Sequence, residues 1–163
     1  MPSSLLRTTL LAGLLAGTAA CSSEVNITAP EPQVIEEVTF APNLGVDLAA
    51  MTRTESGLYY QDFEVGDGPM PTVGDEVRVA YTGSFADGRQ LDAGEIIYTV
   101  GVASLIDGWE EGLSTMAEGG VRKLVIPPEL GYGLNGRPDL GIPGGLVLVF
   151  DLELVEVVSP TSP

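Results

Sequence analysis

The chain has 163 residues, of which 44% are apolar and 18% are charged, and it contains one cysteine and no histidine. This length suits one domain of about 100–150 residues with a tail, which is enough to bury a core. The missing histidine excludes Ser-His-Asp and Cys-His catalysis and imidazole-bound zinc or haem; the single cysteine excludes an intrachain disulfide, an iron–sulfur cluster and a cysteine zinc site. A net charge of −16 excludes binding to nucleic acid or to an anionic membrane by charge.

Residues 1–20 are typical of an export signal peptide. They carry no acid and one basic residue, Arg7, which precedes an apolar run over 8–20. That run is too short to cross a bilayer as a helix but has the length of the hydrophobic region of a secretory signal. We therefore expect residues 1–20 to be a signal peptide.

The only cysteine, Cys21, directly follows Ala19-Ala20. This order resembles the lipobox of bacterial lipoproteins, in which the cysteine takes a diacylglycerol and becomes the mature N-terminus, although Thr18 stands where that family usually has Leu. We expect lipidation of Cys21; the alternative is an ordinary signal peptide with an incidental cysteine. A multi-chain anchor is effectively permanent, because each buried CH₂ contributes about 0.8 kcal/mol. By resemblance to lipoprotein sorting rules, Ser22 favours the outer membrane.

The composition from Cys21 onward predicts three segments. Residues 21–52 are expected to form a lipidated N-terminus and an extended, solvated tether, because prolines and acids are frequent and no hydrophobic period is sustained. A short helix over 46–51 is an option within it. The folded domain is expected over 53–158, followed by a frayed tail over 159–163.

The expected domain is dominated by strands. Alternating or continuous apolar patterns predict strands over 57–65, 76–85, 95–100, 121–126 and 146–157. Asp87-Gly88 predicts a tight turn after the second of these, because both residues tolerate positive φ. The last strand opens with five apolar residues and then alternates, as a strand does when it runs from the buried centre of a sheet towards an edge.

One amphipathic helix is expected between these strands. Leu105, Trp109, Leu113 and Met116 fall on one face of a 3.6-residue period, and Gly119-Gly120 is expected to end the helix. Five or six strands and one short helix predict an α+β fold, in which a twisted antiparallel sheet wraps around the helix.

Most candidate sites for chemistry fail on geometry. Glu110 and Glu111 point about 100° apart on a helix, so they cannot flank one substrate bond and are interpreted as a solvated face. The spacing of 131–136 matches a dinucleotide-binding fingerprint, but Pro138 and Pro143 follow where a helix should begin. The chain has no calcium loop, and Arg122-Lys123 is too small for a phosphate site.

The remaining candidates are apolar and aromatic side chains around one long loop. Most of them are interpreted as core. The segment 127–145 has no clear period, and a loop of that length in a compact domain is usually functional or disordered. Tyr132 lies within it and can offer a hydroxyl at the rim of an apolar pocket.

At these residues the chain resembles the FKBP family, the macrolide-binding peptidyl-prolyl isomerases, over residues 56–158. Each matching segment is weak alone, but the six occur in order at near-family spacing. They are Val-Ala-Tyr-Thr-Gly at 79–83, Asp-Gly-Arg-Gln-Leu-Asp at 87–92, Ile-Asp-Gly-Trp-Glu-Glu-Gly-Leu at 106–113, Lys-Leu-Val-Ile-Pro at 123–127, Leu-Gly-Tyr-Gly at 130–133 and Leu-Val-Phe-Asp-Leu at 148–152.

The resemblance implies a pocket between sheet and helix. It makes the indole of Trp109 the floor, Asp92 the pocket carboxylate, and the Ile106 N–H and the Tyr132 hydroxyl the donors to the carbonyls that flank an Xaa–Pro bond. With these it assigns Tyr81 and Phe150 to the catalytic set. The residues expected to bind substrate are Leu91, Ile96, Tyr98, Leu105, Leu140 and Ile142.

The pocket also departs from the family pattern. Leu91 and Ile96 stand where the family usually has Phe, so two aromatic walls are thinner. The segment between Asp92 and Ile96 is shorter and lacks the Arg that normally pairs with the pocket Asp, and the loop near 137–140 has about one residue extra.

The function implied is prolyl isomerisation that assists the folding of exported proteins. An alternative is a lipid-anchored chaperone or binding module with the same fold and little turnover. We expect a monomer that acts on Pro-containing, unfolded polypeptides, attaches to the membrane through Cys21 and uses no metal or cofactor.

Overall fold

The computed structural model of the chain describes residues 31–102 and 105–158. The expected signal peptide, Cys21 and the tail lie outside these residues. The described part contains six strands, one α-helix and five short 3₁₀ helices. Their bounds are η1 Ile35–Glu37, η2 Pro42–Leu44, η3 Leu48–Ala50, β1 Thr52–Arg53, β2 Tyr59–Glu64, β3 Glu76–Phe85, β4 Gln90–Thr99, α1 Asp107–Leu113, β5 Val121–Ile126, η4 Pro128–Leu130, η5 Pro138–Leu140 and β6 Leu148–Val158.

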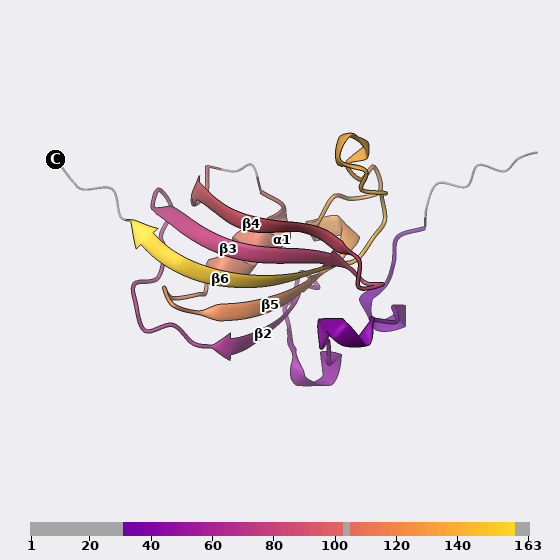
Figure 1. Cartoon of the computed structure of the whole chain (residues 1–163), viewed down its shortest axis with the longest axis horizontal. Helices are drawn as coiled ribbons and strands as arrows, with labels where there is room; N and C mark the ends of the chain where they lie inside the picture. The colour runs from indigo at the N-terminus through magenta and orange to yellow at the C-terminus, as the bar shows by residue number, and fades with distance from the viewer. Residues whose placement is uncertain (1–30, 103–104, 159–163) are drawn as a thin grey trace, which may run out of the picture.

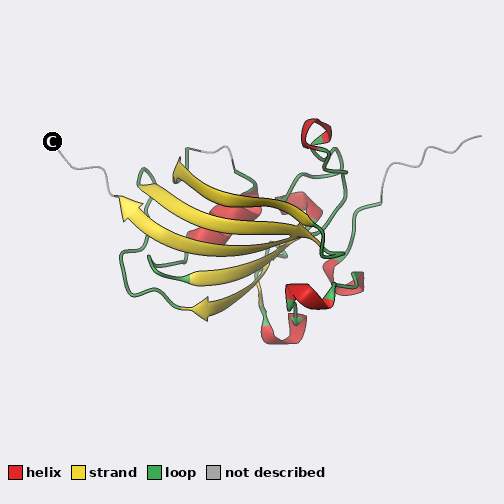
Figure 2. Cartoon of the chain, in the orientation of Figure 1, coloured by secondary structure: helices red, strands yellow, loops and turns green. Residues whose placement is uncertain are grey.

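The strands form one antiparallel sheet in the order β1-β2-β5-β6-β3-β4. The sheet is twisted, and α1 lies across one of its faces (Figures 1 and 2). The expected α+β fold, a sheet of five or six strands with one short helix, is confirmed, with six strands in the sheet. The predictions of 76–85 and 121–126 match β3 and β5 to the residue, because both strands combine strong β-formers with clear patterning.

Strands β2 and β6 differ by one or two residues from their expected bounds, and two elements differ by more. Strand β4 begins at Gln90, whereas the sequence predicted residue 95. The first residues of this edge strand pair with β3 but show no hydrophobic period, so the pattern did not reveal them. Helix α1 ends at Leu113, not at Gly119-Gly120. The two glycines bond to β6 instead: the Gly119 N–H donates to the Leu154 carbonyl, and the Gly120 carbonyl accepts from the Leu154 N–H.

Helix α1 is held directly against β5. A Cβ on Gly108 would lie 2.7 Å from Ile126, and one on Gly112 would lie 2.6 Å from Leu124, so only glycine allows this contact. The buried core on this face of the sheet is Leu58, Val77, Val79, Phe85, Val100, Trp109, Leu113, Met116, Leu124, Ile126, Ile142, Leu148, Phe150, Leu152 and Leu154.

Residues 31–51, here called the N-terminal strap, pack on the opposite face of the sheet. The expectation of an extended, solvated tether was wrong for this segment. Ile35, Leu44 and Met51 are buried there, although no period links them. Their partners on the sheet are Tyr59, Val125, Val147 and Val149. Burial of these apolar side chains outweighs the entropy that an extended chain would keep.

The strap explains the continuous apolar runs of β5 and β6. In each strand, successive side chains point to opposite faces, and at this end of the sheet both faces are covered. The five apolar residues at the start of the last predicted strand are therefore explained by burial on both faces of the sheet, and not only by a central place in it. No helix in the described ranges is long and apolar enough to span a membrane.

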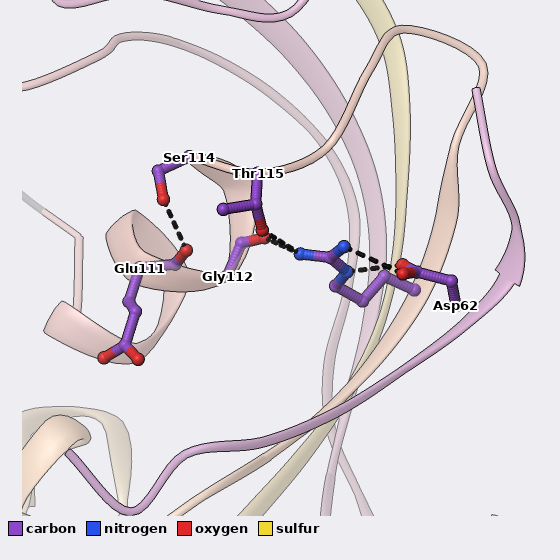
Figure 3. Close-up of polar contacts among 6 residues, drawn as sticks. Asp62, Glu111, Gly112, Ser114 and Thr115 are labelled. Carbon is purple, nitrogen blue, oxygen red and sulfur yellow. Dashed lines mark hydrogen bonds and ion pairs between the residues drawn. The ribbon is translucent and has the colours of Figure 1, made fainter. Parts of the chain in front are cut away.

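A buried arginine links α1 to the sheet. The Arg122 guanidinium donates to both carboxylate oxygens of Asp62 on β2, at 2.6 and 3.0 Å, and to the Gly112 carbonyl and the Thr115 hydroxyl, both at 2.6 Å. Figure 3 shows Asp62 on one side of this group and Gly112 with Thr115 on the other. The side chain is 5% exposed, so these hydrogen bonds replace the hydration that the guanidinium loses on burial.

We predict that Arg122→Met lowers the free energy of unfolding by about 2–4 kcal/mol, because it leaves Asp62 and the end of α1 without their buried partner. Urea unfolding monitored by circular dichroism measures the loss. The matched control is Arg89→Met, which removes an ion pair of 70% and 56% exposed side chains with Asp87 and should cost less than about 1 kcal/mol. Equal losses in the two variants would contradict the assignment.

Candidate functional site

A cavity of about 430 Å³ opens between the sheet, α1 and the loop of residues 127–145. Its lining contains every pocket residue expected from the sequence except Tyr98, and it adds one residue, Arg137. The lining residues are Tyr81, Leu91, Asp92, Ile96, Leu105, Ile106, Trp109, Tyr132, Arg137, Leu140, Ile142 and Phe150.

Three rings meet at the floor of the cavity. Trp109, 4% exposed, contacts Tyr81 and Phe150 edge to face, with ring centroids 5.1 and 5.3 Å apart. This geometry is the preferred one for aromatic pairs and fixes the indole plane. Gly83 provides the space for the Phe150 ring, which a Cβ at that position would overlap. The floor is thus rigid and apolar.

Asp92 is held in the wall by a hydroxyl rather than by a basic side chain. The Tyr81 hydroxyl donates to one Asp92 oxygen at 2.7 Å, and the Ala93 N–H donates to the other at 2.9 Å. The hydrogen bond to the carboxylate raises the pKa of Tyr81 to about 12, with burial adding to the effect. Tyr81 is therefore a neutral hydrogen-bond partner, which orients Asp92 without neutralising the charge of its carboxylate.

The loop that carries Tyr132 is stabilised by its own backbone. The Gly133 N–H donates to the Pro128 carbonyl, the Gly136 N–H to the Tyr132 carbonyl, and the Gly145 N–H to the Gly133 carbonyl. A Cβ on Gly136 would overlap the other limb of the loop, and its φ of +62° also favours glycine. The glycines of this segment therefore allow two limbs to pack backbone against backbone.

Tyr132 presents a protonated hydroxyl at the rim. Burial raises its pKa, so it remains a hydrogen-bond donor at neutral pH. Ile106 precedes α1 in an extended conformation, with φ −71° and ψ 145°. Because it lies before the first helical turn, its N–H is not used in the bonds of the helix. The cavity thus has two donors at its edge and apolar walls between them.

Tyr98 is not brought into the cavity. It packs against the core on the helix side, where its buried hydroxyl has no hydrogen-bond partner among the described residues. Burial, and secondly the charge of Glu110, raises its pKa. Strand alternation places Tyr98 on the same face of β4 as Ile96, so its side chain faces the core. It lies two residues further along the strand than Ile96, and it does not line the cavity.

Arg137 is the lining residue that the sequence analysis did not assign. It forms an ion pair with Asp139 at 2.8 Å, and its backbone pairs with Ile142 across the loop. The sequence feature that could have identified Arg137 is its position, because it is the only basic residue in the loop of residues 127–145. Within the described ranges, no group of His, Cys, Asp or Glu side chains is arranged to hold a metal ion.

We predict that Asp92→Asn lowers the pKa of Tyr81 from about 12 towards its ordinary value of 10, because the charged acceptor is lost. Since the folded-state pKa is raised, the hydrogen bond stabilises the fold fully below about pH 10, and this contribution is lost as the pH rises through about 12. Titration of ¹³C-labelled tyrosines by NMR measures the shift. An unchanged Tyr81 titration in Asp92→Asn would show that the carboxylate is not the cause.

Several known proteins are similar to this chain in sequence and fold. FkpA from Escherichia coli K12, an FKBP-type peptidyl-prolyl cis-trans isomerase, is 43% identical over 124 residues, which cover 72% of this chain and 42% of FkpA. FK506-binding protein 4 of Dictyostelium discoideum is 41% identical over 103 residues, 61% of this chain and 28% of that protein. The chain therefore matches less than half the length of these two relatives. The FK506-binding protein of Neisseria meningitidis is 40% identical over 106 residues, 62% of this chain and 96% of that protein.

Solved structures agree with these matches. The crystal structure of FkpA superposes with a TM-score of 0.62 at 40% identity, over 67% of this chain and 52% of FkpA. That of AtFKBP13 gives 0.62 at 33% identity, over 65% of this chain and 97% of the other. The family model described as FKBP-type peptidyl-prolyl cis-trans isomerase matches residues 68–155. The chain belongs to the family of FKBP-type peptidyl-prolyl cis-trans isomerases.

Proposed function

We propose that this protein is a peptidyl-prolyl cis-trans isomerase that acts on Xaa–Pro bonds of extended polypeptides. The observation that carries the proposal is the apolar cavity floored by Trp109, with a hydrogen-bond donor at Tyr132 and a backbone N–H at Ile106. Membership of the family and its isomerase relatives support the same activity.

The reaction needs a shaped environment rather than an acid or a nucleophile, because no covalent bond is broken. Amide resonance gives the Xaa–Pro bond a rotational barrier of about 18–20 kcal/mol. Twisting the bond reduces the charge on its carbonyl oxygen, so an apolar cavity destabilises the planar amide relative to the twisted one. Lowering the barrier by about 5 kcal/mol accelerates rotation roughly 10³–10⁴-fold.

The cavity residues have complementary roles in this proposal. The proline ring rests on Trp109, with Ile142 above it and aliphatic walls at Leu91 and Ile96. The Tyr132 hydroxyl and the Ile106 N–H bind the carbonyls on either side of the rotating bond. These donors hold the two ends of the peptide while the bond between them turns, which favours the strained geometry.

We predict that the purified chain accelerates cis-trans exchange of an Ala-Leu-Pro-Phe peptide in NMR exchange spectroscopy, and that Tyr132→Phe lowers kcat/KM by about 3–10-fold. That loss corresponds to one hydrogen bond of about 0.5–1.5 kcal/mol. Tyr60→Phe is the matched control, because Tyr60 lies on β2 outside the cavity lining and should retain full activity.

Two results would contradict the assignment. Absence of acceleration by folded protein at tens of micromolar would leave the anchored binding module as the better account. Full activity in Tyr132→Phe combined with Leu105→Ala would place the activity outside this cavity.

The proposed isomerase is exported and tethered to a bacterial membrane by lipid on Cys21, with the outer membrane favoured by Ser22. The support is in the sequence: the apolar run over 8–20 and the small residues that lead into the only cysteine. Its proposed substrates are unfolded exported proteins, whose uncatalysed prolyl isomerisation takes about 10–100 s. We propose that it works as a monomer.

We predict that a bacterium expressing the chain incorporates labelled palmitate into it and that Cys21→Ser abolishes the label, because the thiol is the acylation site. Detergent phase partition provides a second measurement, in which the wild-type chain enters the detergent phase and the variant remains in water. Thr18→Ala is the control and should retain the label. Labelled Cys21→Ser protein would overturn the anchor.

A further inference from the structure

The N-terminal strap is joined by hydrogen bonds to the loop that carries Tyr132. The Gln33 N–H donates to the Gly145 carbonyl at 2.8 Å, and the Gln33 side-chain Oε1 accepts from the Val147 N–H at 2.8 Å. One residue therefore binds the end of the loop and the chain that leads into β6. The strap and the loop meet at the same end of the sheet (Figure 1).

Both bonds are made to buried residues of the chain. Val147 is 1% exposed, so its N–H would remain unsatisfied without the Gln33 side chain. Gly145 has a φ of +76°, and a Cβ on it would lie 3.2 Å from the carbonyl oxygen of Glu31. The strap backbone is thus seated on Gly145 in a position that a side chain would crowd.

The position of Gly145 in turn sets that of Tyr132. The Gly145 N–H donates to the carbonyl of Gly133, the residue after Tyr132, at 2.8 Å. The neighbouring Gly144 is packed so closely that a Cβ would overlap the Leu134 carbonyl. A short path of backbone contacts therefore leads from Gln33 through Gly145 to the residue that offers the rim hydroxyl.

We propose that Gln33 is a positioning residue for the isomerase site: by binding the Val147 N–H through its side chain and Gly145 through its backbone, it fixes the end of the loop and holds the Tyr132 hydroxyl where it binds the substrate carbonyl. The inference rests on the proposed function and extends it to residues upstream of 68–155, the part matched by the family. Gln33 contacts no substrate in this account. The catalytic unit therefore includes the strap, which the sequence alone presents as a tether.

The experiment compares three variants of the whole chain. Gln33→Ala keeps the backbone bond to Gly145 but removes the acceptor for the buried Val147 N–H, which loosens the end of the loop; it is expected to lower kcat/KM by about 3–10-fold, as loss of the rim donor does. Gln33→Glu keeps an acceptor oxygen at the same reach and should restore activity. Tyr59→Phe removes another strap hydrogen bond, from Tyr59 to Glu36 at 2.6 Å, and should leave activity unchanged.

A double-mutant cycle distinguishes positioning from general destabilisation. If Gln33 acts through the Tyr132 hydroxyl, Gln33→Ala should cause no further loss in a Tyr132→Phe background. Full activity of Gln33→Ala, an equal loss in Tyr59→Phe, or an undiminished effect of Gln33→Ala in the Tyr132→Phe background would each overturn the proposal.

A readout without turnover separates this proposal from the proposed function. In ¹³C-tyrosine NMR, Gln33→Ala should shift the Tyr132 resonance and speed amide exchange at Gly145 and Val147, whereas Tyr59→Phe should not. If the wild-type chain proves inactive, the isomerase assignment fails, and this comparison alone decides the positioning. An unmoved Tyr132 resonance in Gln33→Ala would overturn it.

Discussion

Close contact between one short helix and the sheet is the constraint on which the rest of the structure depends. A seven-residue helix has too few internal hydrogen bonds to be stable alone, so α1 exists because it packs on β5. Gly108 and Gly112 permit that contact, and Arg122 anchors the end of the helix. The orientation of Trp109, and with it the floor of the cavity, follows from this packing.

The second face of the sheet is equally important for the site. The N-terminal strap covers Val125, Val147 and Val149, which would otherwise form an exposed apolar patch on the ends of β5 and β6. Because the loop of residues 127–145 connects these same two strands, any element that fixes their ends also fixes the loop. Support for the cavity thus comes from both faces of the sheet.

The lining of the cavity contains very few polar groups. Its charged wall residue, Asp92, is bound by the neutral Tyr81, and Arg137 is engaged by Asp139 at the rim. The centre of the cavity is left to aromatic and aliphatic side chains. This distribution suits a reaction in which charge on a carbonyl decreases, because an apolar centre penalises the more polar planar amide.

Much of the fold was predictable because it depends on local patterning. The alternation of 76–85 and 121–126 located two strands, and the resemblance of the motifs around Trp109 and Tyr132 to the FKBP family located the pocket. The end of α1 was misplaced because Gly119 and Gly120 bond to β6, which the local sequence does not reveal. Prediction of where helices and strands end is therefore wrong where long-range hydrogen-bond partners replace local ones.

By itself, the sequence determined the α+β architecture and the exclusion of histidine and cysteine chemistry, since these follow from composition and short-range spacing. Most of the cavity lining was expected from the resemblance of its motifs to the FKBP family. Only the tertiary structure decided that the strap is docked, that Tyr98 faces the core and that Arg137 enters the cavity. Gln33 and Val147 are 114 positions apart. Contacts at such separation depend on how the whole chain folds back on itself, which no local period of hydrophobicity records.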